Sequence, residues 1–156
     1  MVQSHDTQNP DPIELLTLDH RAVDRLFAQF DQAKEEQSRQ RIIREAVAAV
    51  AVHAAIEEEI FYPAARELIA DKQLIDTAIE EHAEVKRVMD DLAETHDVAA
   101  RSEKFLALAR LVKEHIKEEE TQLFPKLDVK RAADFGDLGA QLRDRKEELS
   151  RVSLFL

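Results

Sequence analysis

A chain of 156 residues with 44% hydrophobic content is long enough for one domain with a single core. With only two Gly and four Pro and no β-type alternation, the sequence predicts helices throughout, and the absence of Cys excludes disulfides, thiolate nucleophiles, zinc fingers and iron–sulfur ligation. The net charge of −11 argues against nucleic acid or an anionic membrane surface as a partner.

The N-terminal residues carry no targeting signal. Residues 1–10 lack the basic start and the apolar core of a signal peptide, and no apolar run approaches the ~20 residues of a membrane span. We therefore expect a cytoplasmic protein without a membrane partner. Residues 1–11 are predicted to form a flexible arm in which His5 has no role.

The first two predicted helices each carry a buried histidine. One runs over residues 12–35, with Asp11 as its N-cap, and its apolar stripe contains His20. The next begins near Ser38 and carries His53 and Glu57 on its inward side. An unpaired carboxylate in that stripe would be costly to bury, so Glu57 requires a compensating partner.

The second half of the chain follows the same plan. Pro63 is predicted to kink or interrupt the second helix, which resumes as far as residue 70. A third helix over residues 72–95 carries His82 inward, and a fourth, ending near residue 127, carries His115 and Glu119. Residues 129–156 are predicted to add a fifth amphipathic helix, with its apolar terminus docked or in an interface. Its apolar positions are Leu138, Leu142, Leu149 and Val152.

This pattern occurs twice in the sequence as an internal repeat. The segment from His53 to Pro63 returns 62 residues later (53 to 115), and the same offset maps the surroundings of His20 onto those of His82. Such a repeat indicates a duplicated pair of antiparallel helices that cannot bury its apolar face alone. We therefore predict an all-α, up-down four-helix bundle over residues 12–128, with a C-terminal helical extension over residues 129–156.

The repeated His and Glu residues indicate a metal site. A single His on an apolar stripe is more often a hydrogen-bonded core residue, but four at one shared offset are not independent accidents. His and Glu four residues apart lie on one face of a helix. The acidic neighbours Glu58 and Glu120 turn about 140° from their histidines and are expected to face solvent.

The ligand types restrict the choice of metal. Four imidazoles and two carboxylates exceed one tetrahedral zinc site and suit iron or manganese. Two ions bridged by Glu57 and Glu119, with two histidines each, account for all six side chains. The alternative is an interaction bundle whose buried polar residues only fix the helix register.

These motifs resemble the hemerythrin-like (HHE cation-binding) domains. Their pattern is a His on helix 1, His-x-x-x-Glu on helix 2, a His on helix 3 and His-x-x-x-Glu or a close variant on helix 4. The resemblance covers residues 12–128 and includes the Phe61-Tyr62-Pro63 and Leu123-Phe124-Pro125 segments. It implies one iron held by His20 and His53, a second by His82 and His115, and bridges from Glu57, Glu119 and an oxo or hydroxo group.

One departure from the family bears on function. Its oxygen carriers have a fifth His where this chain has Lys86, whose repeat counterpart is Asp24. Three readings of Asp24 and Lys86 are open. They are ordinary surface charges, they form a salt bridge across the pseudo-axis beside the metals, or Asp24 is an additional ligand. Tyr62 would reach an iron only if Pro63 distorts the helix, since regular geometry points it away.

The resemblance, with this departure, implies an open position on both irons. We therefore expect a non-haem di-iron protein that decomposes hydrogen peroxide in a catalase-like reaction and also handles nitric oxide. The alternative is a module that binds, senses or stores oxygen or iron without turnover. The sequence predicts no oligomeric state.

Overall fold

The computed structural model describes residues 8–128 and 132–153, and every regular element within these ranges is helical. The prediction of an all-α chain is therefore confirmed. The expectations for His5 and for the apolar residues 154–156 lie outside the described residues. None of the helices in the described ranges is long and apolar enough to cross a lipid bilayer.

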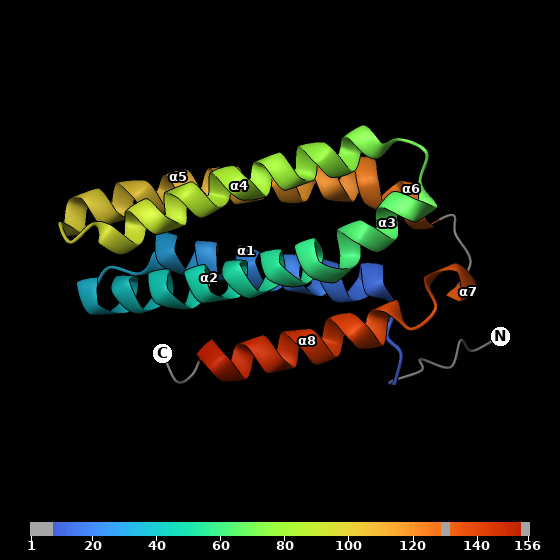
Figure 1. Ribbon diagram of the computed structural model, residues 1–156. Helices are drawn as coiled ribbons and strands as arrows, with labels where there is room; N and C mark the ends of the chain where they lie inside the picture. The colour runs from blue at the N-terminus through green and yellow to red at the C-terminus, as the bar shows by residue number, and fades with distance from the viewer. Residues whose placement is uncertain (1–7, 129–131, 154–156) are drawn as a thin grey trace.

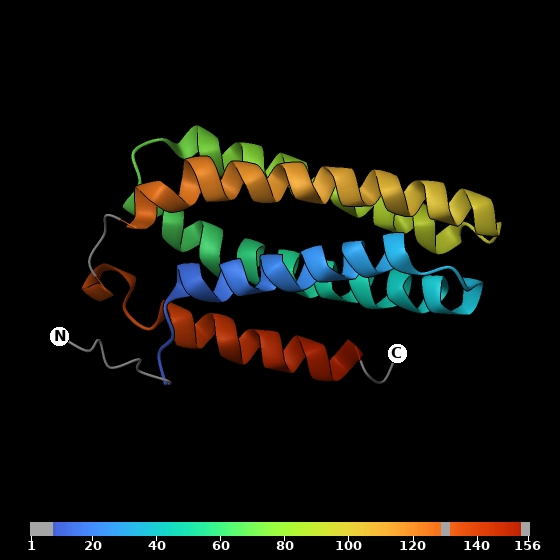
Figure 2. The same ribbon diagram turned by 180° about the vertical axis from the view of Figure 1, so that it is seen from behind.

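Two antiparallel helix pairs make up most of the molecule. The first pair is α1 (Pro12–Gln32) with α2 (Glu36–Ile56), and the second is α4 (Lys72–Glu94) with α5 (Val98–Glu118). The two pairs lie side by side along their length (Figures 1 and 2). Asp11 caps α1 as predicted, because its side chain accepts a hydrogen bond from the Ile13 N–H at 2.8 Å. The start of α2 lies two residues before the predicted Ser38.

Each second helix of a pair continues through a π-helical turn. The turn η1 (Glu57–Phe61) leads into α3 (Tyr62–Leu68), and η2 (Glu119–Leu123) leads into α6 (Phe124–Asp128). In these turns the N–H of Tyr62 donates to the Glu57 carbonyl, five residues back, and the N–H of Phe124 donates to the Glu119 carbonyl. A proline follows each turn and supplies no N–H, so the interruption predicted at Pro63 takes the form of a wider turn before it.

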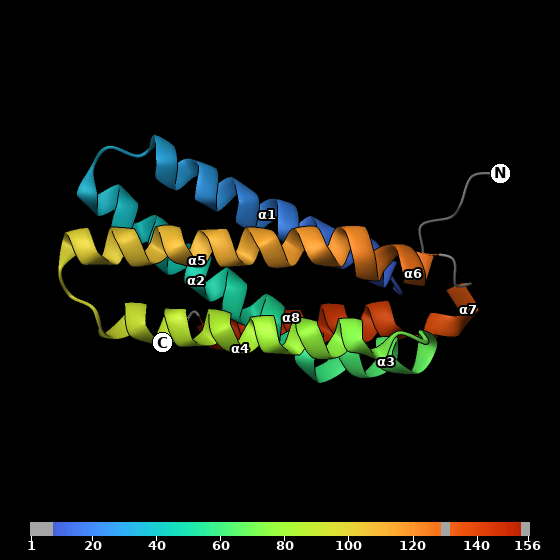
Figure 3. The ribbon, with the colours of Figure 1, turned by 90° about the horizontal axis from the view of Figure 1, so that it is seen from above.

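Two apolar clusters lie toward opposite ends of the long helices, whose courses Figure 3 shows from above. Helices α1, α2 and α4 contribute to both clusters, whereas α5 contributes only to the second and its continuation through η2 and α6 only to the first. A short polar interval lies between the two clusters. Representative members of the first cluster are Leu16, Ile56, Phe61, Ile75 and Leu123, and those of the second are Phe27, Phe30, Val50, Val85 and Phe105. The polar interval contains all six predicted metal ligands, which therefore form one layer within the core.

The short α7 (Ala132–Phe135) and the longer α8 (Leu138–Ser153) complete the described chain. The α8 helix lies along α1 and α2 on the side away from α4 and α5 (Figures 1 and 2). Leu138 and Leu142 are buried there, whereas Val152 is exposed, so the predicted apolar stripe does not reach the end of this helix. A Cβ atom on Gly139 would lie 1.6 Å from the Pro10 carbonyl oxygen, so only glycine allows the N-terminal segment to cross here.

Candidate metal site

The six predicted ligands converge in the polar layer. Within the described residues, His20, His53, Glu57 and Glu119 offer ligand atoms to one point, and Glu57, His82 and His115 offer them to a second. The ligands come from α1, the α2–η1 junction, α4 and the α5–η2 junction. The four-residue spacing from His to Glu places each of these pairs on one inward face.

The four histidines form two pairs. Nε2 of His20 lies 3.1 Å from Nε2 of His53, and Nε2 of His82 lies 3.0 Å from Nε2 of His115. Two ligand atoms that are each about 2.1 Å from one ion, at right angles to each other, lie about 3.0 Å apart. The spacing within each histidine pair therefore fits neighbouring ligands of one octahedral ion.

Each glutamate reaches one histidine of each pair. Glu57 Oε1 lies 2.7 Å from His53 Nε2 and 3.6 Å from His82 Nε2. Glu119 Oε1 lies 3.3 Å from both His20 Nε2 and His115 Nε2. The two carboxylates thus stand between the pairs, where each could contact both ions.

A carboxylate also faces the outer nitrogen of every histidine. The Nδ1–H of His53 donates to Asp19 at 3.0 Å, and that of His115 donates to Glu81 at 3.1 Å. Nδ1 of His20 lies 3.4 Å from Glu120, and Nδ1 of His82 lies 3.7 Å from Glu58. A proton held on Nδ1 leaves the Nε2 lone pair directed inward, which is the form of imidazole that binds a metal.

These contacts correct two expectations. Glu58 and Glu120 are half-buried beside histidine nitrogens and do not simply face solvent. Their positions follow the repeat: Glu120 from the second half faces His20 in the first, and Glu58 from the first half faces His82 in the second. The π-helical turns begin at the preceding glutamates and alter the regular 100° step on which the outward prediction relied.

Several buried polar atoms in the cluster have no hydrogen bond of acceptable geometry within the described chain. They are both carboxylate oxygens of Glu57, Oε1 of Glu119, and Nδ1 of His20 and His82. Each unsatisfied buried polar group costs about 1–3 kcal/mol. A pair of cations placed between the imidazoles would satisfy all three oxygens, so the residues present fit a two-metal site.

The pKa values within the cluster also fit a site for metal ions. Burial lowers the pKa of His53, but the charge of Glu57 and the hydrogen bond to Asp19 raise it further, to about 10. Burial likewise opposes protonation of His115, yet Glu119 and Glu81 raise its pKa to about 11. Burial also raises the pKa of Glu57, but the positive charge of His53 holds it well below 4.5. Glu57 therefore stays ionised, and in the metal-free site protons occupy the imidazoles of His53 and His115.

Tyr62 enters the cluster, contrary to the direction predicted from a regular helix. Its hydroxyl donates to Glu119 Oε2 at 2.9 Å and lies 3.0 Å from His82 Nε2 and 3.3 Å from His115 Nε2. In an α-helix Tyr62 would point about 140° away from Glu57, whereas the π-helical turn places it above Glu57. Burial, followed by the charges of Glu119 and Glu57, raises the pKa of Tyr62 well above 10.

The repeat counterpart of Tyr62 makes the two halves of the site unequal. Phe124 occupies this position in the second half, and its ring stacks on His20 with the centroids 5.7 Å apart. The pair formed by His82 and His115 therefore has a hydroxyl group beside it, whereas the pair formed by His20 and His53 has an apolar ring.

The structure does not bring Asp24 or Lys86 into the cluster. The side chain of Asp24 is 36% exposed and lies 3.4 Å from Arg21, on its own helix. Lys86 is 59% exposed, and its amine lies 3.6 Å from Glu58. Both side chains start at the edge of the inward face and turn to the surface, so neither makes the proposed salt bridge across the site and Asp24 is not placed as a ligand.

Comparison with known proteins connects this geometry to a family. The chain matches the model of the hemerythrin HHE cation-binding domain over residues 11–127. It is also similar to a curated protein named DNA nickase from Nostoc sp. strain PCC 7120, with 27% identity over 128 residues. That match covers 80% of this chain but only 35% of the nickase.

A solved structure has the same arrangement of helices. The crystal structure of a hemerythrin HHE cation-binding domain-containing protein from Mycobacterium kansasii matches this chain with a TM-score of 0.78. The match covers 91% of this chain and 88% of that protein, at 24% sequence identity. This likeness establishes a hemerythrin-like fold.

Proposed function

Because the chain belongs to the hemerythrin HHE cation-binding domain family, we propose that its polar layer holds two iron ions. His20 and His53 would bind one ion, and His82 and His115 the other. Glu57 and Glu119 would bridge them, since each lies between the two histidine pairs. The observation that carries this proposal is the set of three buried carboxylate oxygens without hydrogen bonds between converging imidazoles.

The choice of iron rests on the ligand chemistry. Imidazole nitrogens and carboxylate oxygens together suit iron, and six-coordinate geometry agrees with the spacing within each histidine pair. The helices that carry these ligands would form one four-helix bundle, with α8 as an added layer. The two bundle halves supply equivalent ligands because they descend from one repeated hairpin.

Tyr62 would be an additional ligand of the second ion. Its oxygen lies at ligand-like spacing from His82, His115 and Glu119. A nearby metal ion favours the phenolate, so it would reverse the rise in pKa that burial and the carboxylates cause in the metal-free site. Phe124 has no oxygen to offer the first ion, so the two ions would differ in coordination.

We assign the decomposition of hydrogen peroxide to this site. In that reaction one peroxide loses two protons and two electrons to become dioxygen, and the other gains them to become two waters. The iron pair supplies the two-electron store that this exchange requires. In the described cluster the second ion would have two histidines, two glutamates and Tyr62, and the first ion the same set without a tyrosine. This would leave one of six positions on the second ion and two on the first for a small molecule.

The surrounding side chains would control protons during this reaction. Asp19 and Glu81 keep Nδ1 of His53 and His115 protonated, which fixes the tautomer and the ring orientation. In the metal-free site the Tyr62 hydroxyl holds its proton against Glu119 Oε2, and Tyr62 would release that proton on binding the second ion as a phenolate.

The partners we propose are small molecules, namely peroxide, dioxygen and nitric oxide. Nucleic acid is not among them, because a chain with a net charge of −11 repels phosphate. The similarity to the Nostoc nickase covers only 35% of that protein, so its nicking activity is not carried over.

Oxygen evolution from peroxide by the iron-loaded protein tests the function. His53→Ala should abolish oxygen evolution, and His96→Ala is the matched control because His96 is an exposed histidine in the turn after α4. Equal rates for His53→Ala and the native chain would rule out this site as the catalyst. Reversible oxygen uptake without peroxide turnover would instead support the binding module.

A further inference from the structure

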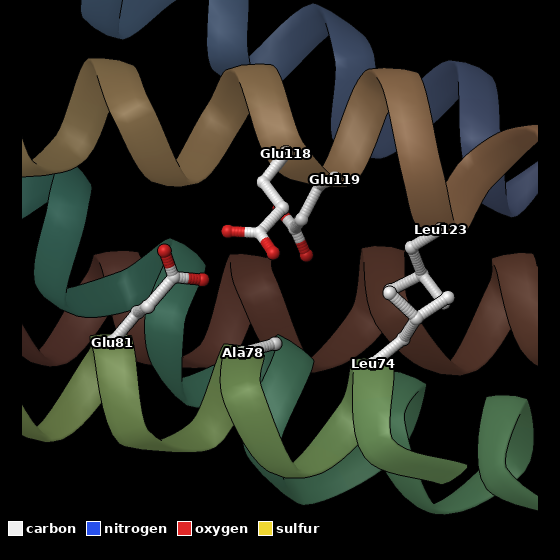
Figure 4. Close-up of a pocket in the computed structure, with 6 residues that line it drawn as sticks. All are labelled: Leu74, Ala78, Glu81, Glu118, Glu119 and Leu123. Carbon is white, nitrogen blue, oxygen red and sulfur yellow. The ribbon is translucent and has the colours of Figure 1, made fainter. Parts of the chain in front are cut away.

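A pocket opens between α4 and the α5–η2 junction, directly beside the polar layer. Its walls are Leu74, Ala78, Glu81, Glu118, Glu119 and Leu123. Figure 4 shows the side chains of α4 facing those of α5 and η2 across this space. Glu119 is 2% exposed, and its Oε1 atom has no hydrogen bond within the described chain, so one wall of the pocket is a buried carboxylate with one unpartnered oxygen.

The repeat provides a counterpart for every wall residue. At the offset of 62, these six positions correspond to Pro12, Leu16, Asp19, Ile56, Glu57 and Phe61. The α8 helix packs against α1, α2 and η1, which carry these counterparts. It therefore covers the equivalent place on the first half of the molecule.

Ion pairs also join α8 to the first half of the molecule. Lys146 of α8 contacts Asp19, and Arg145 binds Glu59 at 2.7 Å. Glu81, the counterpart of Asp19, is 28% exposed where Asp19 is 9% exposed. The two halves are thus related by the repeat, but α8 closes only the first.

The residues that line the pocket also make the second half more open than the first. Leu16 fills the first half where the second has the smaller Ala78, and Ile56 lies where the second half has the half-buried Glu118. These two exchanges leave open space and a polar rim on the second half. The pocket therefore lies where the sequences of the two halves differ.

We infer that this pocket is the entrance through which small uncharged molecules reach the second metal position, and that α8 blocks the equivalent entrance to the first. The inference rests on the proposed metal pair. The empty space is about 200 Å³ with its open mouth included, and its enclosed part has room for about one molecule of the size of water. It suits molecules of the size of peroxide, dioxygen or nitric oxide.

The lining adds selectivity by charge. Leu74, Ala78 and Leu123 give an apolar wall, while Glu81, Glu118 and Glu119 place negative charge around the path. Anions are repelled by these carboxylates, whereas neutral molecules are not. An entrance of this kind admits peroxide in preference to anions of similar size.

A crystal of the metal-free protein under xenon pressure tests the pocket without any iron. Xenon enters small apolar spaces, and we expect a site beside Ala78 and Leu123 and none between α8 and the first half. Ala78→Leu, which copies the residue that fills the first half, should remove it. A xenon site under α8, or one that persists in Ala78→Leu, would overturn the inference even if the protein binds iron.

Binding kinetics test the route in the iron-loaded protein. Ala78→Leu should slow nitric oxide binding to the ferrous form by about tenfold or more, with the iron content unchanged. Ala109→Leu is the matched control, because Ala109 is equally buried but lies in the apolar cluster away from the site. Equal rates for Ala78→Leu and Ala109→Leu would refute this route, whereas loss of peroxide turnover with normal entry would refute only the proposed function.

A charge change at the half-buried Glu118 tests the entrance without filling the pocket. Glu118→Lys should accelerate azide binding to the ferric form, because it replaces a repelling charge by an attracting one. Nitric oxide binding should remain unchanged, since that molecule carries no charge. An azide rate that does not respond to the charge at this position would contradict the entrance.

Discussion

Replacing Glu57 by Leu should stabilise the metal-free protein and remove the stability that iron provides. Glu57 is fully buried, and neither of its carboxylate oxygens has a hydrogen bond of acceptable geometry within the described chain. Leu has a similar size and no polar atoms. In the absence of metal the charge of Glu57 is compensated mainly by protonated His53, whose pKa it helps to raise to about 10.

The size of the effect follows from these contacts. Each unsatisfied buried polar group costs about 1–3 kcal/mol, and replacing a buried charged group by a well-packed apolar one stabilises some proteins by about 1–4 kcal/mol. His53 can release its extra proton when Glu57 is absent, so no buried charge is stranded. We therefore expect metal-free Glu57→Leu to be about 1–3 kcal/mol more stable than the native chain. Glu119→Leu should gain less, because Glu119 accepts a hydrogen bond from Tyr62.

Iron should reverse this order. A ligand at a thousand times its dissociation constant stabilises the native state by about 4 kcal/mol, and only the native chain retains both bridging carboxylates. Urea denaturation followed by circular dichroism measures the free energy of unfolding. It is done first with chelator and then with ferrous iron under anaerobic conditions, which gives the stability of the metal-free and of the iron-loaded protein. Ile56→Val is the control, since it should cost about 0.5–1.5 kcal/mol in both states.

The opposite result would refute the reasoning about the buried carboxylates. If Glu57→Leu lowered the stability of the metal-free protein and iron stabilised it as much as the native chain, Glu57 would be a structural residue. The stability of the site would then not depend on cations.

Three further predictions concern the surroundings of the cluster. Tyr62→Phe should retain both ions but lose the visible charge-transfer band of a ferric phenolate; a band that survives would exclude Tyr62 as a ligand. Lys146→Met removes the cation that contacts Asp19, and should weaken binding of one ion out of two by about 10-fold in a chelator competition; equal weakening of both ions would contradict the asymmetry. The pKa values of about 10 for His53 and about 11 for His115 lie above the ordinary 6.5, so their contribution to stability is complete below pH 6.5 and lost as the pH rises toward 10. The melting temperature of the metal-free protein should therefore fall across this range, and a flat profile would contradict the coupling.

The repeat was enough to predict which six side chains meet. An α-helix has a fixed period, so His and Glu four residues apart share a face wherever the helix packs. The offset of 62 then identified equivalent positions in the two halves. The predicted helix ends differ from the observed ones by a few residues, because capping and fraying decide them locally.

Tyr62, Glu58 and Glu120 show where this reasoning stops. A period of 3.6 residues places Tyr62 away from the cluster, and the π-helical turn that brings it back has no simple pattern in the sequence. Pro63, which lacks an N–H, was the only local indication that the turn is irregular. The repeat itself contained a further signal, because Tyr62 and Phe124 are equivalent positions with different chemistry.

The role of α8 could not be predicted from its own sequence. Its amphipathic pattern indicated a helix but not the surface that the helix covers. Contacts between Lys146 and Asp19 and between Arg145 and Glu59 join residues far apart in the chain, so no local pattern in the sequence predicts them. Only the folded arrangement reveals that one half of the repeat is covered and the other open.

Anomalous diffraction at the iron absorption edge, from crystals grown with ferrous iron, tests the central claim most directly. We expect two separate peaks, one between His20 and His53 and one between His82 and His115, with Glu57 and Glu119 between them. No peak in the polar layer, or a single ion bound elsewhere, would contradict the assignment of these buried carboxylates and imidazoles to a metal pair.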